Sequence, residues 1–170
     1  MLKPQAPAPP LDVELVGGGR WNLADQQPDA FSMLVFYRGL HCPVCSGYAK
    51  QLDSMLEDFA AVGVTSVIAI SGDTAKRAQR SVEEWRIEHL SVGYGQTVDS
   101  MREWGLFVSK GIKEGEPALF GEPGLFLIRP DGNVYAEVLN SMPFARPRFD
   151  ELLGSIAWVN EHDYPARGEA

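Results

Sequence analysis

The chain has 170 residues, of which 45% are hydrophobic and 22% are charged, and this length suits one globular domain. Its 15 Lys and Arg residues against 23 Asp and Glu residues give a net charge of −8. That charge argues against binding to nucleic acid and against docking on anionic membranes through a basic patch. No segment approaches the roughly 20 apolar residues of a membrane span, and the start MLKPQAPAPP lacks the apolar stretch of a secretory signal. We therefore expect a cytoplasmic protein.

The first residues predict a lead-in followed by a β-hairpin. Residues 1–10 are rich in proline, and we expect them to be flexible. Two short strand-like segments, 13–16 and 20–23, flank three consecutive glycines at 17–19, which supply the positive φ of a tight turn. A phosphate-binding loop is the alternative, but no Lys-Ser/Thr pair follows these glycines and no helix begins there.

The middle of the chain alternates strand and helix patterns. Near-continuous apolar runs at 31–37 and 64–70 are typical of central strands that are covered on both faces. Between them, apolar residues at helical spacing predict one helix from Pro43 to about residue 62, ended by Gly63. The later pattern predicts a helix at 74–85, a strand at 91–94 and a brief helix at 98–104.

The last third predicts a loop, a second hairpin and a final helix. Residues 105–121 are rich in glycine and are expected to form an irregular loop. Strands at 125–128 and 134–139 flank a Pro-Asp-Gly turn, and residues 149–159 form an amphipathic helix. The order of elements predicts an α/β fold with a mixed central sheet and helices on both faces. We expect one domain over 11–164, followed by a loose tail at 165–170.

The two cysteines of the chain, Cys42 and Cys45, form a C-x-x-C where a strand gives way to a helix. Pro43 suits the first helical position, which makes Cys42 the N-cap. The free N–H groups and the positive end of the helix dipole favour a thiolate at Cys42, and Cys45 lies one turn away. A nucleophilic thiolate with a second thiol in reach is what thiol–disulfide exchange requires.

Two other interpretations of the cysteine pair compete with redox chemistry. Half of a zinc site is one, but zinc takes four ligands and the sequence has no second C-x-x-C and only scattered histidines. The other is two reduced cysteines that pack as small hydrophobic residues, which suits a helix N-terminus poorly. The sequence favours the redox interpretation over both and predicts no metal. No dinucleotide fingerprint is present either, so we expect no bound cofactor.

Three ordered motifs resemble a known family. The strand–C-x-x-C–helix unit, VIAISGD at 67–73 and PGLFLIRPDGNVY at 123–135 are similar to the thioredoxin fold, and closest to its peroxiredoxin-like (AhpC/TSA, redoxin) branch. The resemblance covers about residues 11–160. It implies a three-layer thioredoxin-like sandwich and a thiol-based antioxidant or oxidoreductase activity.

The expected active site departs from the peroxiredoxin pattern. The family motif P-x-x-x-T-x-x-C places Arg38 at the proline, Cys42 at the threonine and Cys45 at the peroxide-reactive cysteine. An arginine typical of the family falls on Pro123. Thioredoxins instead have a cis-proline at that place beside the disulfide, so the resemblance implies a cis peptide bond before Pro123.

Two residues near the cysteines are candidates for supporting roles. Arg38 is either a solvated loop cation or a fixed charge that lowers the pKa of the thiolate and attracts anionic or peroxide oxygens. His41 either tunes the thiolate or covers the site as a wall. A hydrolase-type general base at His41 is disfavoured, because adjacent side chains rarely point at each other.

We expect an enzyme that uses Cys42 and Cys45 to reduce disulfides or peroxides. The position at the helix terminus nominates Cys42 as the attacking thiolate, whereas the family pattern nominates Cys45 for peroxides. Thioredoxin or glutathione as reducing partner, and a homodimer, are implied by the resemblance. The alternative function is a redox-responsive protein-binding module without turnover, with residues 105–121 as its partner surface.

Overall fold

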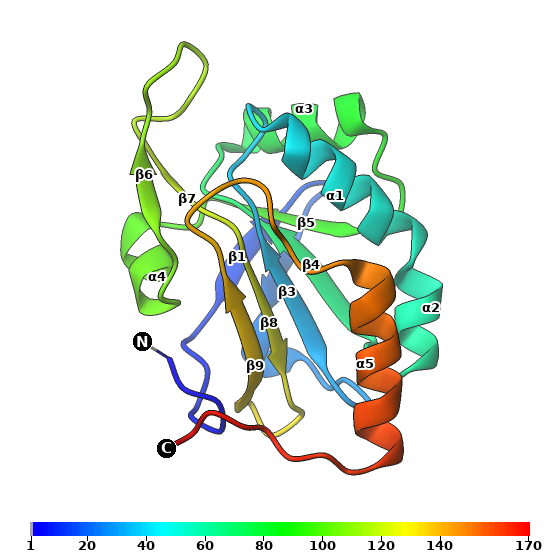
Figure 1. The fold of residues 1–170 in the computed structure, drawn as a ribbon. Coiled ribbons are helices and arrows are strands. Elements are labelled where there is room, and N and C mark those ends of the chain that lie inside the picture. The colour runs from blue at the N-terminus through cyan, green and yellow to red at the C-terminus, as the bar shows by residue number, and fades with distance from the viewer. Residues whose placement is uncertain (1) are drawn as a thin grey trace.

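A computed structural model describes residues 2–170, which form one seven-stranded sheet, five α-helices and a separate two-stranded hairpin. The strands of the large sheet lie in the order β2-β1-β5-β4-β3-β8-β9 (Figure 1). These strands are β1 Asp12–Leu15, β2 Arg20–Asn22, β3 Ser32–Phe36, β4 Ser66–Ile70, β5 Ser91–Tyr94, β8 Gly124–Ile128 and β9 Val134–Leu139. The helices are α1 Pro43–Ser54, α2 Leu56–Ala61, α3 Ala75–Trp85, α4 Val98–Glu103 and α5 Phe149–Glu161, with a short 3₁₀ helix at Leu23–Asp25.

The sheet is mixed, as the sequence predicts. Strands β3, β4 and β5 run parallel, which requires the crossover helices α1 to α3 between them. Strand β8 pairs with β3 in antiparallel fashion, β9 pairs with β8, and the hairpin of β1 and β2 extends the other side through β5. The thioredoxin-like architecture, with a mixed sheet and an N-terminal β-hairpin, is therefore confirmed.

Two hydrophobic cores lie on opposite faces of the sheet, because alternate residues of a strand point to opposite sides. From β3, Met33 and Val35 enter one core, and Leu34 and Phe36 enter the other. The first core packs against α1, α2, α3 and α5 and includes both cysteines. The second core is covered by α4 and by the segments near the N-terminus (Figure 1). The C-x-x-C therefore belongs to the larger helical layer.

Two details differ from the sequence-based expectations. The helix expected from Pro43 to about residue 62 is interrupted at Met55, whose φ of −110° and ψ of 6° separate α1 from α2. Residues 105–121, expected to be an irregular loop, contain the antiparallel hairpin of β6 (Val108–Lys110) and β7 (Leu119–Gly121). This hairpin projects from the body beside the N-terminal end of α1 (Figure 1). Strands of three residues are too short to show an alternating pattern.

The two chain ends make contacts with each other and with β9. The backbone of Gln5 donates to Val134, and the N–H of Val134 donates to Ala6. The side chain of Gln5 also donates to the carbonyl of Ala166, which is buried. Both ends thus lie together against the edge strand β9 (Figure 1). No helix within residues 2–170 is long and apolar enough to cross a membrane.

Candidate functional site

The cysteine pair lies at the junction between β3 and α1, as expected. Cys42 is the N-cap residue of α1 and Pro43 is its first helical residue. The Sγ of Cys42 accepts a hydrogen bond of 3.3 Å from the backbone N–H of Cys45. An N-cap side chain normally satisfies one of the free N–H groups of the first helical turn, and here a sulfur does so. The predicted roles of Cys42 and Pro43 in starting the helix are confirmed.

Both cysteines are free thiols and each is only 1% exposed. A hydrogen bond from the Cys45 thiol lowers the pKa of Cys42 to about 6, with help from the backbone N–H of Cys45, Arg146 and Arg38, although burial opposes the change. Burial raises the pKa of Cys45, and its donation to Cys42 raises it further. Near neutral pH the arrangement therefore holds a thiolate at Cys42 and a thiol at Cys45.

Arg146 is the main site residue that sequence reasoning missed. Its Nη2 lies 3.0 Å from the Sγ of Cys45 and 3.9 Å from the Sγ of Cys42. The loop between β9 and α5 carries it, where its Nε donates to the carbonyl of Pro143 and its guanidinium lies over the ring of Tyr48. More than 100 residues separate it from the cysteines. No spacing motif could have linked it to them.

Arg38 is a second cation near Cys42 and is mostly buried. Its Nε forms an ion pair of 3.2 Å with Glu122, and its guanidinium lies 4.7 Å from the ring centre of Phe120. The carboxylate of Glu122 also accepts a hydrogen bond from Ser109 on β6. Arg38 is thus a fixed cation that helps to lower the pKa of Cys42, rather than a solvated one. The base of the β6–β7 hairpin anchors it.

His41 lies beside Phe120 with its ring centre 4.7 Å away. Its Nδ1 is 3.4 Å from Nη2 of Arg77, which is itself paired with the buried carboxylate of Asp73. Burial and the positive charge of Arg38 lower the pKa of His41, so its ring is neutral at pH 7. The structure therefore places His41 in a wall next to Cys42, tied to α3 through Arg77.

Pro123 does not have the expected conformation. The Glu122–Pro123 bond is trans, as are all the peptide bonds of residues 2–170, so the predicted cis-proline is wrong. Pro123 lines a small cavity together with Tyr48, Asn140 and Arg146. Proline is tolerated directly before a strand, because its missing N–H is not required by the ladder at that position.

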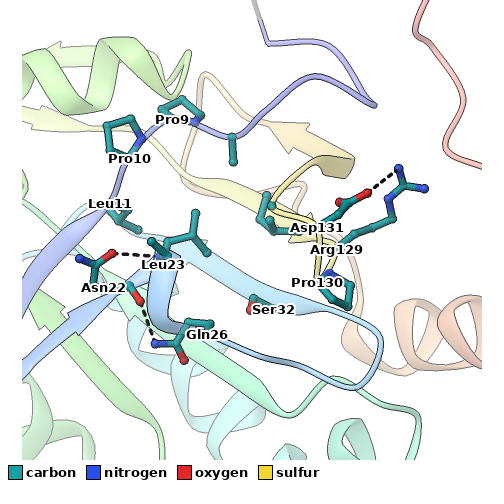
Figure 2. Close-up of a pocket in the computed structure, with 14 residues that line it drawn as sticks. Pro9, Pro10, Leu11, Asn22, Leu23, Gln26, Ser32, Arg129, Pro130 and Asp131 are labelled. Atoms are coloured by element: carbon teal, nitrogen blue, oxygen red, sulfur yellow. Dashed lines mark hydrogen bonds and ion pairs between the residues drawn. The ribbon is translucent and has the colours of Figure 1, made fainter.

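One groove reaches the Arg146 side of the site, and the other large cavities lie away from the cysteine pair. A groove of about 440 Å³ runs past Val44, Gln51 and Phe144 to Arg146. Figure 2 shows a different pocket of about 330 Å³, lined by Pro10, Asn22, Ser32, Arg129 and Asp131 among others. Because Ser32 begins β3 whereas Cys42 follows its end, that pocket lies at the far end of the sheet. No metal-binding group of three or more His, Cys, Asp or Glu side chains occurs in the described part of the chain.

Several solved structures that are similar to this fold are those of peroxiredoxins and peroxiredoxin-like proteins. A solved structure of peroxidoxin BcpB from Mycobacterium tuberculosis is 18% identical, with 94% of this chain and 99% of that chain covered and a TM-score of 0.74. A reduced 2-Cys peroxiredoxin from Plasmodium vivax is 19% identical, with coverage of 96% and 84% and a TM-score of 0.77. A peroxiredoxin-like protein from Aquifex aeolicus is 19% identical, with coverage of 93% and 88% and a TM-score of 0.72.

These likenesses agree with the thioredoxin-like architecture of the sheet and its helices. No curated protein matches the sequence. The family model that matches is that of the AhpC/TSA family, over residues 4–137, which is well over half of the chain. This stretch includes the whole C-x-x-C unit and the strand β8, which pairs with β3. The chain therefore belongs to the AhpC/TSA family.

Proposed function

We propose that the protein is a thiol peroxidase in which the Cys42 thiolate attacks a hydroperoxide and Cys45 resolves the product. The observation that carries this proposal is the hydrogen bonding at Cys42, whose sulfur accepts from the backbone N–H of Cys45 and lies beside Arg146. These contacts stabilise negative charge on sulfur, and the thiolate is the reactive form of cysteine. Membership of the AhpC/TSA family supports peroxide as the oxidant.

The reaction balances with the two thiols and one hydroperoxide. The Cys42 thiolate attacks the terminal oxygen, the O–O bond breaks, Cys42 becomes a sulfenic acid and the alkoxide or hydroxide takes a proton from water. The Cys45 sulfur then displaces water from the sulfenic acid and forms the Cys42–Cys45 disulfide. Two equivalents of an external thiol return the pair to the reduced form and leave as their own disulfide. A thioredoxin or glutathione is the proposed source of those thiols.

The burial of the sulfurs favours a small oxidant over a protein disulfide. With only 1% of each cysteine exposed, a folded substrate would have to displace covering residues before its sulfur could meet Cys42. A hydroperoxide presents only two oxygen atoms to the sulfur. The charges of Arg38 and Arg146 would further attract the polar peroxide group.

Serine variants of each cysteine test which sulfur attacks. Reduced Cys42→Ser and Cys45→Ser proteins are exposed to substoichiometric peroxide at neutral pH with a sulfenic-acid trap, and their intact masses are measured. We expect Cys45→Ser to add one trap molecule quickly, because the serine O–H still donates to Cys42, and Cys42→Ser to react far more slowly. The reverse order would make Cys45 the attacking residue, as the family pattern implies. If both variants were inert, peroxide would not be the substrate.

A redox-responsive binding module is the second candidate function. The observation that favours it is the apolar surface of the β6–β7 hairpin, where Phe107, Ile112 and Leu119 are exposed. Oxidation of the C-x-x-C would alter Arg38 and Glu122 at the base of this hairpin and so change its affinity for a partner. Such a module would not catalyse repeated reduction of a peroxide or a disulfide. Steady consumption of peroxide, or steady reduction of insulin disulfides, would therefore exclude it.

A further inference from the structure

A buried carboxylate on the neighbouring crossover supports the loop that carries Cys42. The side chain of Asp73 is fully buried, and its Oδ2 accepts a hydrogen bond of 2.7 Å from the backbone N–H of Leu40. The approach is so close that a methyl group at Gly39 would lie 2.8 Å from this carboxylate, and Gly39 has a φ of +124°. The carboxylate of Asp73 thus holds the loop before Cys42 in place. The proposed reaction gives Asp73 no other role.

Asp73 also fixes Arg77, and Arg77 fixes the ring of His41. The Nε of Arg77 lies 2.6 Å from Oδ1 of Asp73, and its Nη2 lies 3.4 Å from Nδ1 of His41. Arginine has donors but no acceptor, so Nδ1 of His41 must be the acceptor in this contact. In the neutral imidazole the single proton then resides on Nε2. The contact with Arg77 therefore determines the tautomer of His41.

The Nε2 atom of His41 is the last atom in this chain of contacts. It is buried, and no group within residues 2–170 forms a hydrogen bond with it. A buried N–H without an acceptor is costly, and sites of this kind often await a ligand. The residue directly precedes Cys42, and its ring lies against that of Phe120.

We infer that the Nε2–H of His41, positioned by Asp73 through Arg77, donates a hydrogen bond to the oxygen that leaves when Cys42 attacks a hydroperoxide. This inference rests on the proposed peroxidase function and names a further catalytic residue for it. As the O–O bond breaks, negative charge develops on the leaving oxygen, and a donor placed in advance lowers the energy of that state. His41 keeps its proton throughout, and water supplies the proton that the alkoxide or hydroxide finally takes.

The tautomer is measured directly by nitrogen NMR of the reduced, histidine-labelled full-length protein. The chain has three histidines, and His41→Gln identifies the signal of His41. We expect a neutral ring protonated at Nε2 in the wild type and loss of this preference in Arg77→Met. Arg80→Met is the matched control, since Arg80 lies on the same helix and pairs with the exposed Glu84. A His41 ring protonated at Nδ1, or unchanged in Arg77→Met, would overturn the positioning role.

The donor role is tested by the rate of sulfenic acid formation on Cys42. We expect His41→Leu to slow this step roughly 100-fold, the usual effect of removing one donor to a developing oxyanion. His41→Gln keeps an N–H near the place of Nε2 and should recover most of the rate. A thiolate absorbance titration of each variant separates this role from a change in the pKa of Cys42.

Three results would overturn the donor role. They are an unchanged rate in His41→Leu, a glutamine variant as slow as the leucine variant, and a rate loss fully explained by a shifted pKa of Cys42. A wild-type protein inert to peroxide would refute the proposed function and the donor role together. The NMR measurement would still decide whether Arg77 positions the ring, so the two failures are distinguishable.

Discussion

The Nη2 of Arg146 lies 3.0 Å from the Sγ of Cys45 and 3.9 Å from the Sγ of Cys42, so one guanidinium donates hydrogen bonds to both sulfurs. An arginine typical of peroxiredoxins would fall at Pro123 on the sequence pattern. In this chain the loop before α5 supplies the cation instead. A positive charge beside the cysteine pair therefore comes from Arg146, which is more than 100 residues away in the sequence.

Replacement of Arg146 by Met should weaken the thiolate. The guanidinium contributes to the lowered pKa of Cys42, so its loss raises that pKa and reduces the thiolate fraction at neutral pH. An increase of one unit from about 6 lowers the thiolate fraction at pH 7 from about nine-tenths to about one half, so we expect the reaction with peroxide at this pH to slow by about twofold. Thiolate absorbance against pH measures the first effect, and stopped-flow oxidation measures the second.

Arg148→Met is the matched control for this variant. Arg148 lies two residues away, is exposed, and pairs with Asp150 and Glu151 instead of the sulfurs. Its loss should leave the titration of Cys42 unchanged. If Arg146→Met also titrated like the wild type, the contact between Arg146 and the cysteine pair would have no electrostatic role.

Replacement of Glu122 by Gln should act on Cys42 in the opposite direction. The carboxylate of Glu122 is the buried partner of Arg38, and its loss leaves the positive charge of Arg38 unbalanced near the thiolate. We expect a further decrease in the pKa of Cys42 and, because a buried ion pair is broken, a loss of about 3 kcal/mol in the free energy of unfolding. Thiolate titration and urea denaturation give the two quantities. A higher pKa in this variant would contradict the assigned effect of Arg38.

Asp53 should stabilise the fold in a pH-dependent way. Its carboxylate accepts three backbone N–H groups, from Glu88, His89 and Leu90, and so links α1 to the turn before β5. Burial alone would raise the pKa of Asp53, but these hydrogen bonds bring it below the ordinary value of 3.8. A lowered folded-state pKa means that the stabilisation is complete above 3.8 and is lost as the pH falls through the folded value.

Urea denaturation of Asp53→Ala at several pH values checks this expectation. At neutral pH we expect a loss of about 1–3 kcal/mol in the free energy of unfolding, because three N–H groups lose their acceptor. The difference from the wild type should shrink in acid. Asp58→Ala, which removes an exposed carboxylate on α2, is the control and should have little effect. A difference that stayed constant down to acid pH would contradict the role of the ionised carboxylate.

The parts of the site that sequence reasoning predicted correctly are those with local causes. The helix start at Cys42 and Pro43 follows from capping chemistry within four residues, and the buried strands β3 and β4 follow from apolar runs. The contacts of Arg146, and those of Glu122 with Arg38, join segments distant in the sequence, so no spacing pattern encodes them. The cis-proline was wrong because it rested on a fold resemblance rather than on the residues around Pro123.

The most direct test of the central claim is the pH dependence of sulfenic acid formation in reduced Cys45→Ser protein. We expect a rate that increases with pH and becomes constant by about pH 7, because the serine O–H takes the place of the Cys45 donor and keeps the pKa of Cys42 below its ordinary value. Sulfenic acid formation should be absent in the double variant Cys42→Ser, Cys45→Ser. A rate that kept increasing well above pH 7, or a faster reaction in Cys42→Ser than in Cys45→Ser, would contradict the assignment of Cys42 as the attacking thiolate.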